Sequence, residues 1–257
     1  MAIARSTRTR RWSASLALAA IAALGGYLRF AGPPSWVPSQ GSSAVGVLLH
    51  GARRPFCTAS VVNSPRGDLI ITAAHCLGRK LGRTVMFAPN FRDGRAPFGE
   101  WHVSSEVFPA GWFSHRNVNQ DFAFLTVRGD VQARAGAERL GYSSPVPASV
   151  FVEAYSLTGR VTICMRKPGT IMADGQAQLR FACPGFWSAS SGGPFLTDIN
   201  PRSGLGEMVG IIGGYQQGGA SRSVSYSSPF GVVIHALYAD LTNAARAARR
   251  AGTAASR

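Results

Sequence analysis

Short apolar segments separated by turn residues fill most of this 257-residue chain. The chain has 30 glycines and 15 prolines without a Gly-X-Y period, which predicts many tight turns and short strands. Because no helix is expected between these segments, the pattern predicts an all-β barrel or sandwich. The segments are Val45–Leu49, Ser60–Val62, Leu69–Thr72, Trp101–Val107, Phe122–Val127, Val150–Tyr155, Arg160–Cys164, Ala177–Phe181 and Met208–Ile212.

The two ends of the chain differ from this middle. Residues 1–28 place four arginines ahead of a 17-residue uncharged run, which predicts a signal peptide or a retained membrane anchor. Residues 29–43 are rich in Pro, Ser and Gly and predict a linker, so the folded domain is expected over residues 44–246. Apolar residues at helical spacing predict an amphipathic helix over residues 232–246, and residues 247–257 form a basic tail.

The formal net charge is +15, from 27 basic and 12 acidic residues. Nine arginines lie in residues 1–30 and 241–257, which contain no acid, so residues 31–240 carry only +6. A basic sum suggests a polyanion partner, but this distribution does not, and we expect no nucleic-acid partner. Membrane contact is expected only if the N-terminal segment is retained. An alternative is an envelope-bound protein held to anionic surfaces by its arginine-rich ends.

Four cysteines form two well-separated pairs and allow three disulfide connectivities. We favour Cys57–Cys76 and Cys164–Cys183, because each of these pairs brackets a candidate functional segment. An even cysteine count fits an exported protein. None of the cysteines forms a Cys-x-x-Cys motif, so no metal site is expected, and no motif for an organic cofactor is present.

Three separate segments carry the residue types that serine catalysis requires. His75 lies near the end of an apolar segment, Asp121 opens a run of uncharged residues, and Ser191 is followed by Gly-Gly-Pro. Each has an ordinary structural explanation when taken alone. Together they supply a hydroxyl, a base that titrates near neutral pH, and a carboxylate that can orient the base. The order predicts Ser191 as the nucleophile, His75 as the general base and then acid, and Asp121 as the orienting group.

Gly192 and Gly193 directly follow the candidate nucleophile. Glycine has no side chain, so the pair leaves room around the serine for a substrate carbonyl. The backbone N–H groups of Ala189 and Ser191 are the candidate donors to an oxyanion.

These segments resemble the three signatures of the trypsin/chymotrypsin-like serine proteases. The resemblance implies an all-β fold of two six-stranded antiparallel barrels, over about residues 44–142 and 143–231, with the active site in the cleft and a C-terminal helix. It also supports the first disulfide, which would hold the His75 loop. The signatures are Thr-Ala-Ala-His-Cys76, Asp121-Phe-Ala-Phe-Leu and Ser191-Gly-Gly-Pro. Further segments resemble the secreted bacterial branch near the V8-like glutamyl endopeptidases: Phe56–Val62, Phe87–Phe98 and Ser228–Gly231.

The sequence departs from the family pattern at three places. Ser190 stands where animal trypsins have an Asp that pairs with a new N-terminal ammonium, so this activation switch is not expected. Ala189 replaces a glycine, and a positive φ there would add strain of about 1 kcal/mol or more. The strand expected to line the cleft, Gly210–Tyr215, lacks the family's Ser-Trp-Gly.

The candidate substrate-binding residues are Gly185, Phe186, Gly213, Gly214 and Tyr215. Gly185 occupies the position at which trypsins place an Asp, so cleavage after Arg or Lys is not expected. No His lies near Gly213, which disfavours glutamyl specificity.

Two functions follow from these residues. The first is a secreted, monomeric serine endopeptidase that hydrolyses peptide or protein substrates through an acyl-enzyme. The second is a catalytically weak or inactive homologue that binds peptides or proteins, and Ala189 and the unusual cleft strand motivate it.

Overall fold

The computed structural model describes residues 41–255, except residues 52 and 79–83. The predicted signal peptide or anchor and most of the predicted linker lie outside these residues. Ser42, predicted to belong to the linker, is 1% exposed and hydrogen-bonded to two buried side chains. Ser42, two residues before Ala44, is therefore already part of the packed domain.

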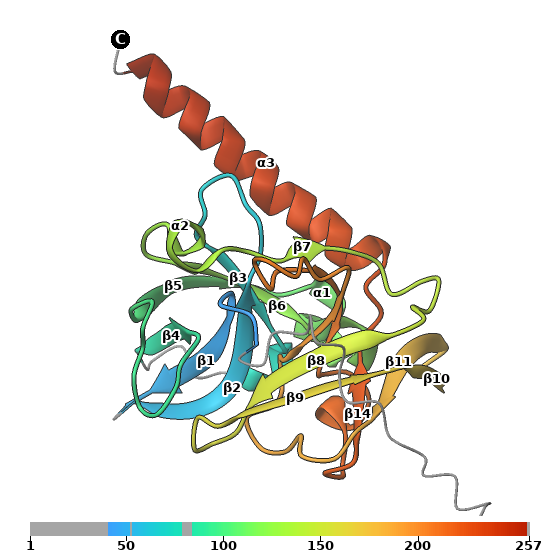
Figure 1. Cartoon of the computed structure of the whole chain (residues 1–257). Coiled ribbons are helices and arrows are strands. Elements are labelled where there is room, and N and C mark those ends of the chain that lie inside the picture. Colours follow the sequence, from blue (N-terminus) through green and yellow to red (C-terminus); the bar gives the residue numbers. More distant parts are fainter. Residues whose placement is uncertain (1–40, 52, 79–83, 256–257) are drawn as a thin grey trace, which may run out of the picture. The chain divides into compact units, whose positions relative to one another are not determined.

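The first half of the domain is a closed barrel of six antiparallel strands (Figure 1). Alternating residues of its strands, such as Leu48, Ile70 and Leu125, are fully buried in one cluster, as expected of strands with one face toward a core. The strand order is β1-β2-β3-β6-β5-β4. The strands are β1 Val45–His50, β2 Arg54–Val61, β3 Leu69–Thr72, β4 Val85–Pro89, β5 Trp101–Val107 and β6 Ala123–Val127.

The second half contains a five-stranded sheet of order β7-β13-β12-β8-β9 and a three-stranded sheet of order β10-β11-β14. All pairs are antiparallel except β7 with β13. A second six-stranded barrel was expected, and in the described residues two sheets stand in its place. Where β13 and β14 approach each other, the Gly213 N–H donates to the Tyr226 carbonyl oxygen and the Ile211 N–H donates to the Ser227 hydroxyl. A side-chain acceptor thus replaces a backbone acceptor at one position between the two strands. The strands are β7 Arg139–Leu140, β8 Val150–Tyr155, β9 Val161–Arg166, β10 Gly169–Ala173, β11 Gln176–Ala182, β12 Pro194–Thr197, β13 Glu207–Ile211 and β14 Val224–Ser227.

The C-terminal helix α3 spans Val232–Ala255 and is longer than predicted. Ile234 is fully buried and Leu237 and Leu241 pack against the same cluster, which confirms the amphipathic pattern. The predicted basic tail is helical to Ala255, because its alanines have the highest helix propensity of any residue. The remaining helices are short: α1 Ala110–His115, α2 Val131–Ala135, and the 3₁₀ turns η1 Ala74–Cys76, η2 Val118–Gln120 and η3 Tyr215–Gly218. In the described part of the chain, no helix is both long enough and apolar enough to cross a membrane.

Candidate active site

His75 lies in the 3₁₀ turn η1, directly after the buried strand β3. The strand ends at Thr72, and Ala73 and Ala74 keep the chain in the core, since both are fully buried. The disulfide Cys57–Cys76 ties η1 to β2. Its neighbour His75 is therefore fixed at the edge of the first barrel with a side chain that is 13% exposed.

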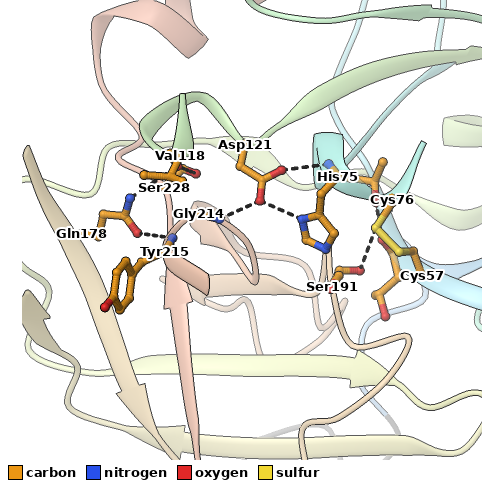
Figure 2. Close-up of polar contacts among 12 residues, drawn as sticks. Cys57, His75, Cys76, Val118, Asp121, Gln178, Ser191, Gly214, Tyr215 and Ser228 are labelled. Atoms are coloured by element: carbon orange, nitrogen blue, oxygen red, sulfur yellow. Dashed lines mark hydrogen bonds and ion pairs between the residues drawn. A yellow bond between two sulfur atoms is a disulfide. The ribbon is translucent and has the colours of Figure 1, made fainter. Parts of the chain in front are cut away.

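Asp121 is placed between η2 and β6, and its side chain is 1% exposed. Its Oδ1 accepts the backbone N–H of His75 at 2.9 Å. Its Oδ2 lies 2.7 Å from His75 Nδ1 and accepts the N–H of Gly214 at 2.8 Å (Figure 2). A buried carboxylate needs such partners. The bond to Nδ1 assigns the proton to that nitrogen, so Nε2 is left as the acceptor.

Ser191 lies on the loop between β11 and β12, below the His75 ring in Figure 2. Thr58 of β2 fixes this loop from the first barrel: its N–H donates to Ser191 O at 2.8 Å and its hydroxyl donates to Ala189 O at 2.9 Å. From the second half, Gly192 N–H donates to Ile212 O at 2.7 Å. The loop is thus held by both halves of the domain. In the described residues, the Ser191 hydroxyl forms no hydrogen bond.

The two glycines after Ser191 are required by close packing. Gly192 has φ +84°, and a Cβ there would overlap the Thr58 carbonyl oxygen. A Cβ at Gly193 would lie 2.6 Å from both the Glu153 carbonyl oxygen and the Ala154 Cβ. A side chain at either position would push the loop out of place.

The residues before Ser191 form a tight turn. Ser190 is 4% exposed; its hydroxyl accepts the N–H of Trp187 at 2.9 Å and donates to Tyr155 O at 3.4 Å. Ser190 therefore holds the turn in place by neutral hydrogen bonds. Ala189 adopts φ +76°, a left-handed conformation in which a Cβ adds strain. Within the described chain, the N–H groups of Ala189 and Ser191 donate to no protein acceptor.

A cavity of about 250 Å³ opens beside His75 and Ser191. No Lys, Arg, Asp or Glu side chain is among its lining residues. Besides His75 and Ser191, the cavity is lined by Phe186, Trp187, Ser188, Ser190, Ile212, Gln216, Gln217, Gly218, Gly219, Ser221 and Ser225.

The structure places one of the five candidate substrate-binding residues, Phe186, in this lining. Gly213 and Gly214 lie against Asp121 and not in the cavity lining. The Gly214 N–H donates to the Asp121 carboxylate. Tyr215 is also absent from the cavity lining. Its N–H donates to Gln178, and its ring packs edge-on against Tyr226.

Gly185, the fifth candidate, also lies outside the lining, where its N–H donates to Arg222 O. The sequence analysis did not predict the other lining residues, among them Ile212, Gln216–Gly219 and Ser225. The Gln-Gln-Gly-Gly run signalled a turn after the cleft strand. Nothing local indicated that this turn faces the cavity.

Both cysteine pairs favoured by the sequence form disulfides, and the described chain contains no free cysteine. The second bridge, Cys164–Cys183, ties β9 to the segment that leads into the Ser191 loop. The described residues contain no group of three or more His, Cys, Asp or Glu side chains suited to a metal ion.

The chain is similar to one protein family and to several solved structures. The family model described as Trypsin matches residues 36–231. Protease Anisep from Arthrobacter nicotinovorans is 21% identical with a TM-score of 0.66, over 79% of this chain and 97% of that one. The thermostable serine protease AL20 from an extremophilic microorganism is 21% identical with a TM-score of 0.67, over 79% and 98%. A Glu endopeptidase is 16% identical with a TM-score of 0.58, over 82% and 93%. A comparison with curated proteins gives no match.

The solved structures support the fold, and the family model spans most of the chain, including the segments that contain His75, Asp121 and Ser191. The chain therefore belongs to the trypsin family and is a serine endopeptidase that acts on peptide or protein substrates.

Proposed function

We propose that the protein is an exported serine endopeptidase in which Ser191, His75 and Asp121 form the catalytic triad. One observation carries the proposal: buried Asp121 receives three N–H groups, two of them from His75, and this holds the imidazole beside Ser191 with Nε2 free. A carboxylate in this position fixes the tautomer that a general base needs.

The reaction follows from these positions. His75 Nε2 takes the Ser191 proton as Oγ bonds to the carbonyl carbon of the scissile peptide. The resulting oxyanion is stabilised by the N–H groups of Ala189 and Ser191, which are without protein acceptors. His75 then gives its proton to the leaving amine as the C–N bond breaks, leaving an acyl-enzyme. Water hydrolyses the ester by the same steps, with His75 again as base and then acid.

The Ser191 hydroxyl forms its hydrogen bond to Nε2 when substrate is bound. Catalytic hydrogen bonds are often long in the unliganded state and tighten in the complex. The neutral lining of the cavity supports substrates with an uncharged side chain before the cleaved bond.

A second function, peptide binding without efficient hydrolysis, is favoured by Ala189. Its Cβ at φ +76° carries strain of about 1–2 kcal/mol, which opposes the backbone conformation of the oxyanion loop. Losing one oxyanion donor typically costs about 3–4 kcal/mol in the barrier.

The proposal of export rests on the signal pattern of residues 1–28, which lie outside the described residues, and on the disulfides, which persist in oxidising compartments. We propose that the mature protein is a monomer, with membrane contact only if the N-terminal segment is retained.

A fluorophosphonate probe tests the triad. We expect it to label Ser191 in the wild-type protein, to fail on Ser191→Ala, and to label His75→Ala at a strongly reduced rate. Unlabelled wild-type protein that still binds peptides would support the second function. Peptide hydrolysis that His75→Ala abolishes would exclude it.

A further inference from the structure

One buried amide, that of Gln178, lies between the two chain segments that meet at Asp121. Gln178 belongs to β11 and is fully buried. Its Oε1 accepts the Tyr215 N–H at 2.9 Å (Figure 2). Its Nε2 donates to Asn119 Oδ1 at 2.8 Å and to Val118 O at 3.3 Å. The amide therefore joins η2, which directly precedes Asp121, to the first residue of η3.

The orientation of this amide is fixed by its partners. The Tyr215 N–H can only donate, so it faces the amide oxygen, and the Val118 carbonyl can only accept, so it faces the amide nitrogen. The oxygen and both N–H bonds of Gln178 thus have partners, as a buried amide requires. A side chain that lacks either function leaves buried backbone groups without a partner.

This amide supports the contact between Gly214 and Asp121. Gly214 donates its N–H to Asp121 Oδ2 at 2.8 Å from a backbone conformation of φ +82° and ψ −129°, which glycine tolerates. A Cβ on Gly214 would lie 2.5 Å from Gln178 Oε1, so the amide packs directly against this glycine. The Tyr215 N–H belongs to the peptide group that follows Gly214. By accepting it, Gln178 holds the glycine in the conformation that reaches Asp121.

The same amide holds the chain just before Asp121. Asn119, one of its two partners there, is 4% exposed and donates its own Nδ2 to Ala173 O at 2.9 Å, at the end of β10. The other partner, Val118 O, also accepts the Ser228 hydroxyl at 2.9 Å. The segment η2 is thus anchored to the second half of the domain, and the carboxylate that follows it is held in place.

We propose that Gln178 is a positioning residue for the catalytic reaction, which keeps the Gly214 N–H on Asp121 and so keeps the carboxylate aligned with His75. The proposal rests on the proposed function of the triad. Asp121 accepts three N–H groups, and the one from Gly214 shares Oδ2 with His75 Nδ1. When Gly214 moves, Oδ2 loses the donor that fixes its direction, and the carboxylate turns relative to the imidazole. The orientation of the general base then worsens.

Replacing Gln178 by Leu removes both hydrogen-bonding functions and keeps a buried side chain of similar size. We expect kcat for peptide hydrolysis to fall by about 10- to 100-fold with little change in KM, because small misplacements of catalytic groups cost up to about 10²-fold. Gln178→Glu keeps the acceptor for Tyr215 but can donate only while it is protonated. Its kcat relative to wild type is therefore expected to fall as the pH rises from 6 to 9.

Ser228→Ala is the matched control. It removes the other donor to Val118 O, but it leaves the Gln178 amide and its bond to Tyr215 in place. We expect kcat of this variant to stay near that of wild type. An equal loss of kcat in Ser228→Ala and Gln178→Leu would overturn the proposal, because any weakening of the polar cluster would then have the same effect.

Amide hydrogen exchange, followed by NMR in a Ser191→Ala background, gives a readout that does not depend on hydrolysis. We expect the Gly214 N–H to exchange at least about tenfold faster in Gln178→Leu than in the parent protein, with the amides of β3 unchanged. A merely structural role would speed exchange of both, and Ser228→Ala is expected to change neither. If Gln178→Leu does not fold, Gln178→Glu is compared with its parent at pH 6 and pH 9 in the same way.

Unchanged exchange of the Gly214 N–H in Gln178→Leu would overturn the proposal. So would faster exchange of Gly214 that is matched by the amides of β3. A wild-type protein that does not hydrolyse peptides would count against the proposed function, whereas the exchange of Gly214 would still decide whether Gln178 holds it on Asp121.

Discussion

Replacing Glu153 by Gln in the intact chain should make the folded state far less sensitive to alkaline pH. Burial raises the pKa of Glu153 from 4.5 to about 8. A raised carboxyl pKa means that the folded state binds the proton more tightly than the unfolded state. The associated stability is fully present below pH 4.5 and is lost as the pH rises through about 8. At about 1.4 kcal/mol per pKa unit, the loss is on the order of 5 kcal/mol above pH 8.

Glutamine keeps the shape of the side chain and the acceptor for Ser42, but it does not ionise. We therefore expect Glu153→Gln to match or slightly lower the wild-type free energy of unfolding at pH 5 and to exceed it by several kcal/mol at pH 9. Urea unfolding followed by tryptophan fluorescence, at pH steps from 5 to 9 in a Ser191→Ala background, measures this difference.

Glu138→Gln is the matched control. Burial raises the pKa of Glu138 to about 7, so the same sign and a smaller gain are expected, on the order of 3 kcal/mol. A difference between Glu153→Gln and wild type that stays constant from pH 5 to pH 9 would refute the reasoning, because the carboxylate would then be as well solvated in the folded protein as in the unfolded chain.

Three further substitutions test the active-site loop and its support. Ala189→Gly removes the Cβ that is strained at φ +76°. Because glycine also costs conformational entropy, we expect a net gain of about 0.5–1 kcal/mol in unfolding free energy, with an equal or higher kcat/KM. A loss of stability would contradict this account. Gly192→Ala brings a Cβ onto the Thr58 carbonyl oxygen. We therefore expect kinetics to show a loss of peptide hydrolysis and urea unfolding to show a fall in stability of about 2 kcal/mol or more. Near-normal hydrolysis would show that the loop moves freely. Replacing both Cys164 and Cys183 by Ser should cost about 2–4 kcal/mol in unfolding free energy, and an unchanged urea midpoint would argue against a structural bridge.

Local sequence was sufficient for the β architecture and for the three catalytic candidates. β-Branched residues bounded by turn residues predict strands, and both signals are local in the sequence. His75, Asp121 and Ser191 lie in short motifs with fixed spacing, and the structure brings the three together. Their catalytic roles stay predictions until the labelling experiment is done.

The lining of the cavity beside His75 and Ser191 could not be predicted from local signals. Gly214 was expected to bind substrate, but its N–H donates to Asp121, and the residues Gln216–Gly219 line the cavity instead. Such a turn depends on a hydrogen bond between residues 93 positions apart. No periodicity of the sequence encodes it.

The sequence by itself predicted an all-β domain, an amphipathic C-terminal helix and the favoured pairing of the four cysteines. It also gave the three candidate catalytic residues in the order His, Asp, Ser. These depend on residue type and near-neighbour spacing. Only the tertiary structure decided that Ser42 is packed into the domain and that Glu138 and Glu153 meet there. Burial and charge pairing arise where distant segments pack together, and 96 and 111 positions separate Ser42 from these two partners.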